Sequence, residues 1–286
     1  MTSQAVMDPF RIVRRPNYVP QQDEEAVFRA AREAGIPLIL KGPTGCGKTR
    51  FVEYMAHILD LPLVTVSCHE DLTAADLVGR FLLKNDQTIW QDGPLTLAVR
   101  YGGLCYLDEI VEARKDTTVI IHSLTDDRRV LYLDKTGAVL RAHPDFMMIL
   151  SYNPGYQSIV KDLKQSTKQR FASIAFSYPS VETEAEIIRT ESGLGSEDSR
   201  KLAEMGAKIR QLKGFGLDEG ASTRLLVYVA RLIRSGLPPV CACTHAISQT
   251  LTEEADVAES VQNIARLYFG ELLDEAAHAP AHSIPP

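Results

Sequence analysis

Apolar residues gather in five short runs in the first two thirds of the chain, and each run predicts a buried β-strand. The runs cover residues 37–40, 61–68, 103–107, 146–152 and 172–178. They lack the alternation of apolar and polar residues typical of a strand exposed on one face, as expected when helices cover both faces. Helical patterns separate several of the runs, so we predict an α/β domain with a parallel five-stranded sheet.

Beyond about residue 180 the strand signals disappear and the periodicity becomes helical. Four segments carry this pattern, at 182–191, 199–212, 222–235 and 256–273. Stretches rich in glycine and proline separate them. We therefore predict an α/β core over residues 1–179 and a small all-α domain over 180–275, followed by a flexible tail over 276–286.

Two further segments extend the predicted core. Residues 129–133 and 138–141, joined by the turn Asp134-Lys135-Thr136-Gly137, predict a β-hairpin between the third and fourth strands. Residues 71–95 form an insertion between the second and third strands and contain the only tryptophan, Trp90. Function often lies on such protrusions, which a rigid scaffold positions.

The composition narrows the function classes. Hydrophobic residues make up 45% and charged residues 24% of the chain, as in ordinary globular proteins. No apolar run is long enough to span a bilayer, and the N-terminus has no basic stretch followed by an apolar one, so we expect a cytoplasmic protein without membrane insertion. The formal net charge of −6 argues against nucleic acid as a partner, because bulk binding needs a basic face.

The cysteines are expected to be reduced in such a protein. They are Cys46, Cys68, Cys105, Cys241 and Cys243. Cys241 and Cys243, with His245 nearby, lack a second ligand cluster that would complete a tetrahedral metal site, so helix packing is the favoured role.

The most informative stretch is Gly42-Pro43-Thr44-Gly45-Cys46-Gly47-Lys48-Thr49, which matches the phosphate-binding pattern G-x-x-x-x-G-K-[ST]. It follows a predicted strand and precedes an amphipathic pattern over residues 50–59, which is the context that the motif needs. Glycines let consecutive backbone N–H groups surround a phosphate, and a helix N-terminus adds partial positive charge. We predict that these eight residues bind ATP, with Lys48 on the β- and γ-phosphates and Thr49 on Mg²⁺.

An apolar strand that ends in two acids, Asp108 and Glu109, matches the Walker B arrangement. Asp108 is predicted to hold Mg²⁺, directly or through water, and Glu109 to polarise the water that attacks the γ-phosphate. The alternative is a simple acidic strand end, but the accompanying phosphate loop favours the catalytic interpretation.

At three further polar residues, the sequence pattern leaves two interpretations open. Asn153 is either a turn residue before Pro154 or, if its strand lies between the other two, a group that orients the attacking water. Arg170 is either a solvated arginine or a contact to the nucleotide of a neighbouring subunit. Arg224, in the first turn of a helix with Ser222 as its expected N-cap, either leans over the nucleotide or lies on the helix surface.

In their order along the chain these motifs resemble those of AAA+ ATPases, and the predicted hairpin and insertion resemble the MoxR branch. Within that branch the chain closely resembles the CbbQ/NirQ/NorQ group, over roughly residues 15–275. The matching stretches are 41–48, 92–96, 106–109, 112–118, 151–157 and 168–171.

The resemblance implies an αβα AAA+ core with a helical lid, and a hexameric ring with ATP between subunits. The residues that it assigns to one subunit are Lys48, Thr49, Asp108, Glu109, Asn153 and Arg224. Arg170 is expected to act across the interface as an arginine finger, although many MoxR proteins have an aspartate where this chain has Gln169. The resemblance also implies a partner with a von Willebrand factor A domain.

Two targets are compatible with the resemblance. CbbQ-like proteins remodel rubisco and release inhibitory sugar phosphates, whereas NirQ- and NorQ-like proteins help to assemble or activate nitric oxide reductase. The motifs are shared by both subgroups. We favour rubisco, although residues 67–73 and 131–135 resemble the nitric oxide reductase branch at least as closely.

Three other function classes fit less well. A P-loop small-molecule kinase needs an arginine-rich clamp, which the helical domain does not obviously offer. A GTPase is disfavoured because the D-x-x-G match at residues 76–79 does not end an apolar strand and no N-K-x-D is present. A non-catalytic, nucleotide-gated scaffold does not need a residue that activates water, so the presence of Glu109 argues against this class.

Overall fold

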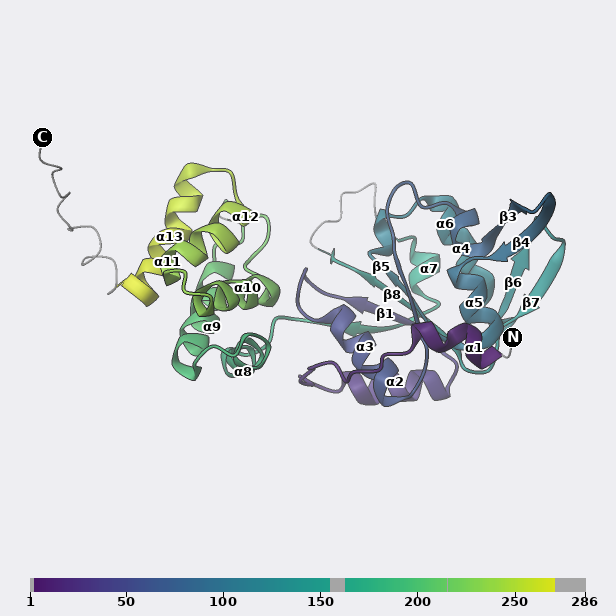
Figure 1. Cartoon of the computed structure of the whole chain (residues 1–286), viewed down its shortest axis with the longest axis horizontal. Helices are drawn as coiled ribbons and strands as arrows, with labels where there is room; N and C mark the ends of the chain where they lie inside the picture. The colour runs from purple at the N-terminus through teal and green to yellow at the C-terminus, as the bar shows by residue number, and fades with distance from the viewer. Residues whose placement is uncertain (1–2, 155–162, 215, 271–286) are drawn as a thin grey trace, which may run out of the picture. The chain divides into compact units, whose positions relative to one another are not determined.

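The computed structural model describes residues 3–154, 163–214 and 216–270. The chain divides into two compact units, Met1–Ser177 and Tyr178–Pro286, each with its own hydrophobic core (Figure 1). The predicted tail over 276–286, the end of the helix predicted to reach residue 273, and residues 155–157 lie outside the described residues.

The first unit contains the predicted parallel sheet, with its strands in the order β2-β5-β8-β1-β9. The strands are β1 (Leu38–Lys41), β2 (Leu63–Ser67), β5 (Gly103–Asp108), β8 (Phe146–Tyr152) and β9 (Ala172–Ala175). All neighbouring pairs are parallel, and every residue of β8 is buried. The sequence prediction of an α/β fold is therefore confirmed.

Two strands are shorter than predicted. The run 61–68 forms a strand only over Leu63–Ser67, because the N–H of Leu61 donates to the carbonyl of Ala56 at the end of a helix. The run 172–178 is a strand only to Ala175, after which Phe176 makes one more hydrogen bond to the sheet, at Lys41.

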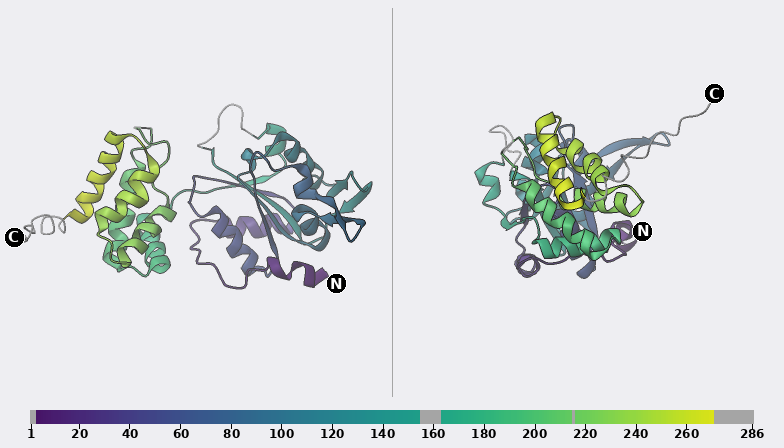
Figure 2. Two further views of the ribbon diagram at one scale, coloured as in Figure 1. Left: turned by 45° about the horizontal axis from the view of Figure 1, so that its top comes forward. Right: turned by 90° about the vertical axis from the view of Figure 1, so that its left-hand side faces the viewer.

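Helices cover both faces of this sheet, which explains why its strands lack alternation. On one face lie α2 (Glu24–Glu33) and α3 (Lys48–Ile58), and on the other lies α5 (Pro94–Tyr101) (Figures 1 and 2). Phe28 of α2 packs edge-on against Phe51 of α3, with ring centroids 5.7 Å apart. Short helices complete the unit: α1 (Ser3–Met7), α4 (Ala74–Val78), α6 (Lys115–Ile120), α7 (Gln165–Lys168), η1 (Asp8–Phe10), η2 (Ile110–Glu112) and η3 (Ile121–Leu124).

Two antiparallel hairpins extend the first unit at one end (Figures 1 and 2). The predicted hairpin is present as β6 (Val130–Leu133) and β7 (Ala138–Arg141). The insertion contains structure that the sequence pattern did not predict, namely α4 and a second hairpin, β3 (Gly79–Lys84) with β4 (Gln87–Asp92). Trp90 packs across this hairpin against Phe81, with ring centroids 5.2 Å apart.

The second unit is helical. It consists of α8 (Val181–Ser192), α9 (Ser196–Arg210), α10 (Thr223–Arg234), α11 (Pro239–Cys243), the π-helix η5 (Thr244–Ser248), α12 (Gln249–Leu251) and α13 (Ala255–Phe269). Ser222 caps α10 as predicted, accepting the N–H of Leu225 at 3.3 Å. The helical turns over 239–251 are too short to show a periodicity, so sequence analysis did not predict them. Cys243 is buried here, with its sulfur 3.7 Å from that of Met205.

One buried ion pair organises the start of α10. Glu184 is fully buried and receives two hydrogen bonds from the guanidinium of Arg210, at 2.6 and 2.8 Å, and one from the hydroxyl of Thr223. Arg210 also donates to the carbonyl of Ala221 and lies over the ring of Tyr178, 3.9 Å from its centroid. Complete pairing of this kind is what permits a buried carboxylate.

Candidate active site

The phosphate loop connects β1 to α3, and its glycines are required by the backbone. Gly45 and Gly47 have φ of 70° and 104°, in the left-handed region that favours glycine. A Cβ on Gly42 would lie 2.6 Å from the carbonyl oxygen of Phe176, so a larger residue cannot fit there. The loop is therefore tightly curled and leads directly into the N-terminus of α3, which is the arrangement of an anion-binding site.

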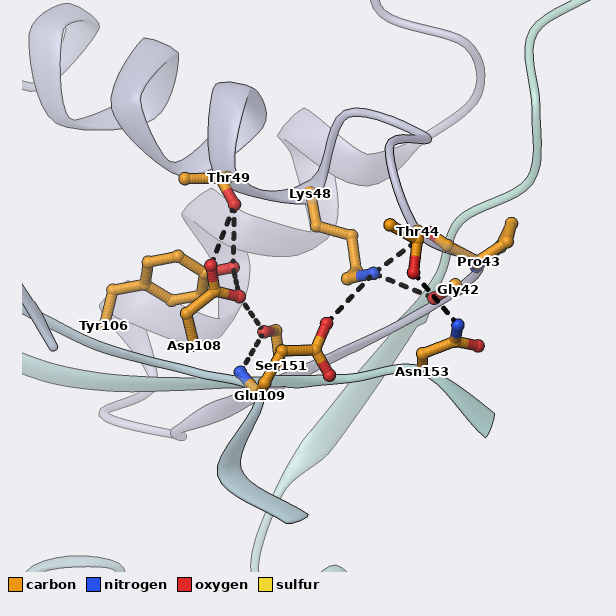
Figure 3. Close-up of polar contacts among 10 residues, drawn as sticks. All are labelled: Gly42, Pro43, Thr44, Lys48, Thr49, Tyr106, Asp108, Glu109, Ser151 and Asn153. Atoms are coloured by element: carbon orange, nitrogen blue, oxygen red, sulfur yellow. Dashed lines mark hydrogen bonds and ion pairs between the residues drawn. The ribbon is translucent and has the colours of Figure 1, made fainter. Parts of the chain in front are cut away.

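Lys48 begins α3 and folds back over the loop. Its ammonium group donates to the carbonyl oxygens of Gly42 and Pro43, at 2.8 and 3.0 Å, and lies 4.0 Å from a carboxylate oxygen of Glu109 (Figure 3). The residue is only 5% exposed, so its charge depends on these oxygens. A buried ammonium group over a glycine loop fits the β- and γ-phosphates of a nucleotide.

Asp108 and Thr49 meet where the end of β5 faces the first turn of α3. The hydroxyl of Thr49 donates to Oδ2 of Asp108 at 3.3 Å. One hydroxyl and one carboxylate beside a phosphate loop are the oxygen ligands from which Mg²⁺–nucleotide sites are built, so the residues present fit that ion.

Glu109 follows β5 in an unusual backbone conformation. Its φ of 53° and ψ of 51° are left-handed, which is uncommon for a residue other than glycine. The N–H of Glu109 donates to the hydroxyl of Ser151 at 3.1 Å, which holds this turn. Burial raises the pKa of the Glu109 carboxyl, the neighbouring Lys48 opposes that rise, and Asp108 adds to it.

Asn153 lies beside the phosphate loop because β8 is the neighbour of β1. Lys41 pairs with Tyr152 in this register, and the N–H of Gly42 donates to the carbonyl of Tyr152 at 3.3 Å. The amide of Asn153 then reaches the hydroxyl of Thr44 at 3.2 Å, and Asn153 is 2% exposed. The strand β8 therefore lies between β5 and β1, as the water-orienting interpretation of Asn153 requires.

Known proteins are similar to this chain over most of its length. One family model, described as AAA domain (dynein-related subfamily), matches residues 37–171, and a second, CbbQ/NirQ/NorQ C-terminal, matches residues 184–268. Protein CbbQ of Hydrogenophilus thermoluteolus is 57% identical over 254 residues, covering 89% of this chain and 95% of that relative. Protein NorQ of Paracoccus denitrificans is 54% identical over 258 residues, covering 90% and 96%.

The chain belongs to the CbbQ/NirQ/NorQ group of MoxR-type AAA+ ATPases. Among solved structures, a point mutant of Thermotoga maritima RuvB superimposes with a TM-score of 0.53 at 13% identity, covering 86% of this chain and 71% of that one. At that identity the likeness concerns the fold alone, and the fold agrees with the family. This CbbQ/NirQ/NorQ-group chain is therefore a nucleotide-binding ATPase.

Sequence analysis singled out two arginines, one in each unit. Arg170 follows α7, and its guanidinium is 3.6 Å from a carboxylate oxygen of Asp126, a residue that also pairs with Arg128 at 2.6 Å. Arg224 is exposed in the first turn of α10, in the second unit. Within the described residues of the first unit, no hydrogen bond or ion pair joins Arg170 to Lys48 or Glu109.

Sequence analysis missed two polar residues of the site. Tyr106 is fully buried in β5, and its hydroxyl donates to Oδ1 of Asp108 at 2.6 Å. Ser151, also fully buried, donates to the same oxygen from β8. In the sequence, each of these two residues is a hydroxyl group within an otherwise apolar run. Such a pattern marks the residue as unusual but does not show which oxygen its hydroxyl will contact.

None of the helices in the described part of the chain has both the length and the apolar character that crossing a bilayer requires.

Proposed function

We propose that this ATPase forms a hexameric ring that works with a von Willebrand A-domain partner to remodel and activate a target enzyme. The observation that carries the proposal is the cluster of Lys48, Thr49, Asp108, Glu109 and Asn153, which brings together the groups needed for ATP hydrolysis. Membership of the CbbQ/NirQ/NorQ group supports the remodelling role.

In this mechanism each residue has a defined task. Lys48 binds the β- and γ-phosphates, and Thr49 and Asp108 hold Mg²⁺, which neutralises charge on the phosphates. Glu109 takes a proton from the attacking water, and Asn153 orients that water. Arg224 contributes from the helical unit, and Arg170 reaches the nucleotide of the neighbouring subunit as an arginine finger.

Hydrolysis then drives movement in the ring. In the proposed cycle, loss of the γ-phosphate shifts the helical unit relative to the α/β core. Ordering and release of loops and domains around a γ-phosphate is a known mode of switching. The protruding hairpins β3–β4 and β6–β7 are the elements through which we expect the movement to reach the partner.

Rubisco is the proposed target, with release of inhibitory sugar phosphates as the outcome. The slightly higher identity to Protein CbbQ supports this choice. Assembly or activation of nitric oxide reductase is the second candidate, because identity to Protein NorQ is almost as high.

A substrate trap tests the proposal. The Glu109→Gln protein with ATP is immobilised and incubated with lysate from cells of its own source grown with and without nitrogen oxides, and Lys48→Ala serves as the control that cannot load nucleotide. ATP-dependent recovery of rubisco with a von Willebrand A-domain protein supports the first target. Recovery of nitric oxide reductase subunits instead assigns the second.

Reconstitution then gives a functional readout. Purified rubisco blocked with an inhibitory sugar phosphate should regain activity only when this ATPase, its partner and ATP are all present. Failure to reactivate, with ATP hydrolysis intact, would exclude rubisco while leaving the ATPase assignment in place.

A further inference from the structure

The hydroxyl of Tyr106 is directed into the active site although its ring belongs to the core. Tyr106 and Asp108 are two residues apart on β5, so their side chains lie on the same face of the sheet. The Tyr106 hydroxyl donates to Oδ1 of Asp108 at 2.6 Å and lies 3.3 Å from the hydroxyl of Thr49. It therefore touches both residues to which we assign Mg²⁺ (Figure 3).

Ser151 acts on the same carboxylate from the neighbouring strand. Because Leu107 pairs with Leu150 in the β5–β8 register, Ser151 lies beside Asp108. Its hydroxyl donates to Oδ1 of Asp108 and accepts the N–H of Glu109 at 3.1 Å. One hydroxyl thus connects the two consecutive acids and holds the left-handed turn at Glu109.

We propose that Tyr106 and Ser151 are positioning residues for the metal–nucleotide site. Together they occupy Oδ1 of Asp108 and thereby turn Oδ2 toward Thr49, and Ser151 also directs Glu109. The proposal rests on the assignment of Asp108 and Thr49 to Mg²⁺ made above. Partners of this kind commonly orient metal ligands, and their loss typically weakens metal affinity about 10- to 100-fold.

The side chain of Tyr106 is fully buried, so its hydroxyl needs a polar partner inside the protein. A buried hydroxyl without a partner carries a cost, whereas phenylalanine would fill the same space in the core without one. The hydroxyl is thus explained by Asp108 and Thr49 and not by packing.

The test is the Mg²⁺ dependence of nucleotide binding in Tyr106→Phe. Affinity for a fluorescent, non-hydrolysable ATP analogue is measured in EDTA and across a Mg²⁺ titration. We expect unchanged affinity in EDTA and a Mg²⁺ concentration for half-maximal enhancement that is about 10-fold higher than in the wild type. A titration identical to that of the wild type, in a folded protein, would overturn the role of Tyr106.

Matched variants separate this inference from its premise and from loss of stability. Thr96→Val removes another fully buried hydroxyl of the same unit, which donates to the carbonyl of Val78 at 2.6 Å, and should leave the Mg²⁺ titration unchanged. Asp108→Asn should abolish the enhancement by Mg²⁺. If Asp108→Asn has no effect, the metal assignment itself is wrong; if only Tyr106→Phe has none, the positioning role alone is wrong.

The role of Ser151 is tested by comparing kcat with nucleotide affinity. Ser151→Ala should lower kcat about 10-fold or more and raise the Mg²⁺ requirement, with little change in analogue affinity in EDTA. Ser151→Thr retains the hydroxyl and should recover most of kcat. If Ser151→Ala has the same kcat as the wild type, or if Ser151→Thr loses as much kcat as Ser151→Ala, Ser151 has no positioning role.

Discussion

The ammonium group of Lys48 and the carboxylate of Glu109 lie 4.0 Å apart, although they come from motifs far apart in the sequence. The first residue of α3 supplies the ammonium group, and the turn after β5 supplies the carboxylate. Because we assign phosphate binding to one and water activation to the other, replacing each should affect a different step of the ATPase cycle.

Glu109→Gln should retain ATP binding and lose turnover. The amide keeps the shape of the side chain but cannot accept a proton, and loss of a general base typically costs about 100- to 10,000-fold. Steady-state phosphate release and equilibrium ATP binding measure the two effects. Glu33→Gln, the same substitution on the exposed surface of α2, is the control; undiminished hydrolysis in Glu109→Gln would refute the role of this residue.

Lys48→Met should weaken nucleotide binding itself. It removes the buried ammonium group from the loop carbonyls and from the phosphates, and hydrogen bonds to charged groups contribute about 1.5–3 kcal/mol each, so at least a 10-fold rise in Kd is expected. Titration calorimetry with ATP measures it. Lys84→Met, at the exposed end of β3, should bind ATP normally, and unchanged affinity in Lys48→Met would contradict the phosphate-loop assignment.

The raised pKa of Glu109 predicts two pH effects. The base must be ionised, so kcat/KM should fall on the acid side with a midpoint above the ordinary range of a glutamate. A carboxyl group whose pKa is raised by folding contributes stability below its unfolded pKa and loses that contribution as pH rises through its folded pKa.

The stability of Glu109→Gln should therefore depend on pH relative to the wild type. The glutamine is neutral throughout, so the variant should have the higher Tm at pH 7, and the difference should vanish near about pH 4. The effect is expected to be small because the Glu109 side chain is 37% exposed. Thermal unfolding at the two pH values checks it, and a lower Tm of the variant at pH 7 would oppose the prediction.

Arg170 offers a test of action between subunits. If it completes the site of a neighbour, Arg170→Ala should bind ATP normally yet hydrolyse it at least about 100-fold more slowly. Mixing Arg170→Ala with Lys48→Met should restore part of the activity, because some interfaces then combine an intact loop with an intact arginine. Arg128→Ala, which removes the other partner of Asp126, is the control. Failure of every mixture would place Arg170 outside the active site.

The Glu184–Arg210 pair should stabilise the helical unit strongly. Breaking a buried ion pair by removing one charge typically costs about 3–5 kcal/mol, because the other charge remains buried and unpaired. Denaturant unfolding of Glu184→Gln measures this, with Glu204→Gln, whose partner Arg200 is exposed, as the control. Equal midpoints for the two variants would show that the buried pair contributes nothing special.

The elements with a strong local signal were predictable. The glycine loop, the acidic end of β5 and the β6–β7 hairpin all depend on residues that are adjacent in the chain, so their patterns survive without knowledge of the fold. The absence of alternation in the five apolar runs likewise reports burial on both faces, and the parallel sheet follows from it. These signals were sufficient for the family, because its motifs occur in a set order.

Contacts between distant strands required the three-dimensional arrangement. Register places Ser151 of β8 beside Asp108 of β5, and no local pattern determines which residues of two parallel strands become neighbours. Tyr106 looks like any aromatic core residue until α3 brings Thr49 over the same face of the sheet. The sequence therefore determines the groups to which we assign the chemistry, whereas packing determines which hydrogen bonds hold them, because those bonds form between elements that meet only in the folded chain.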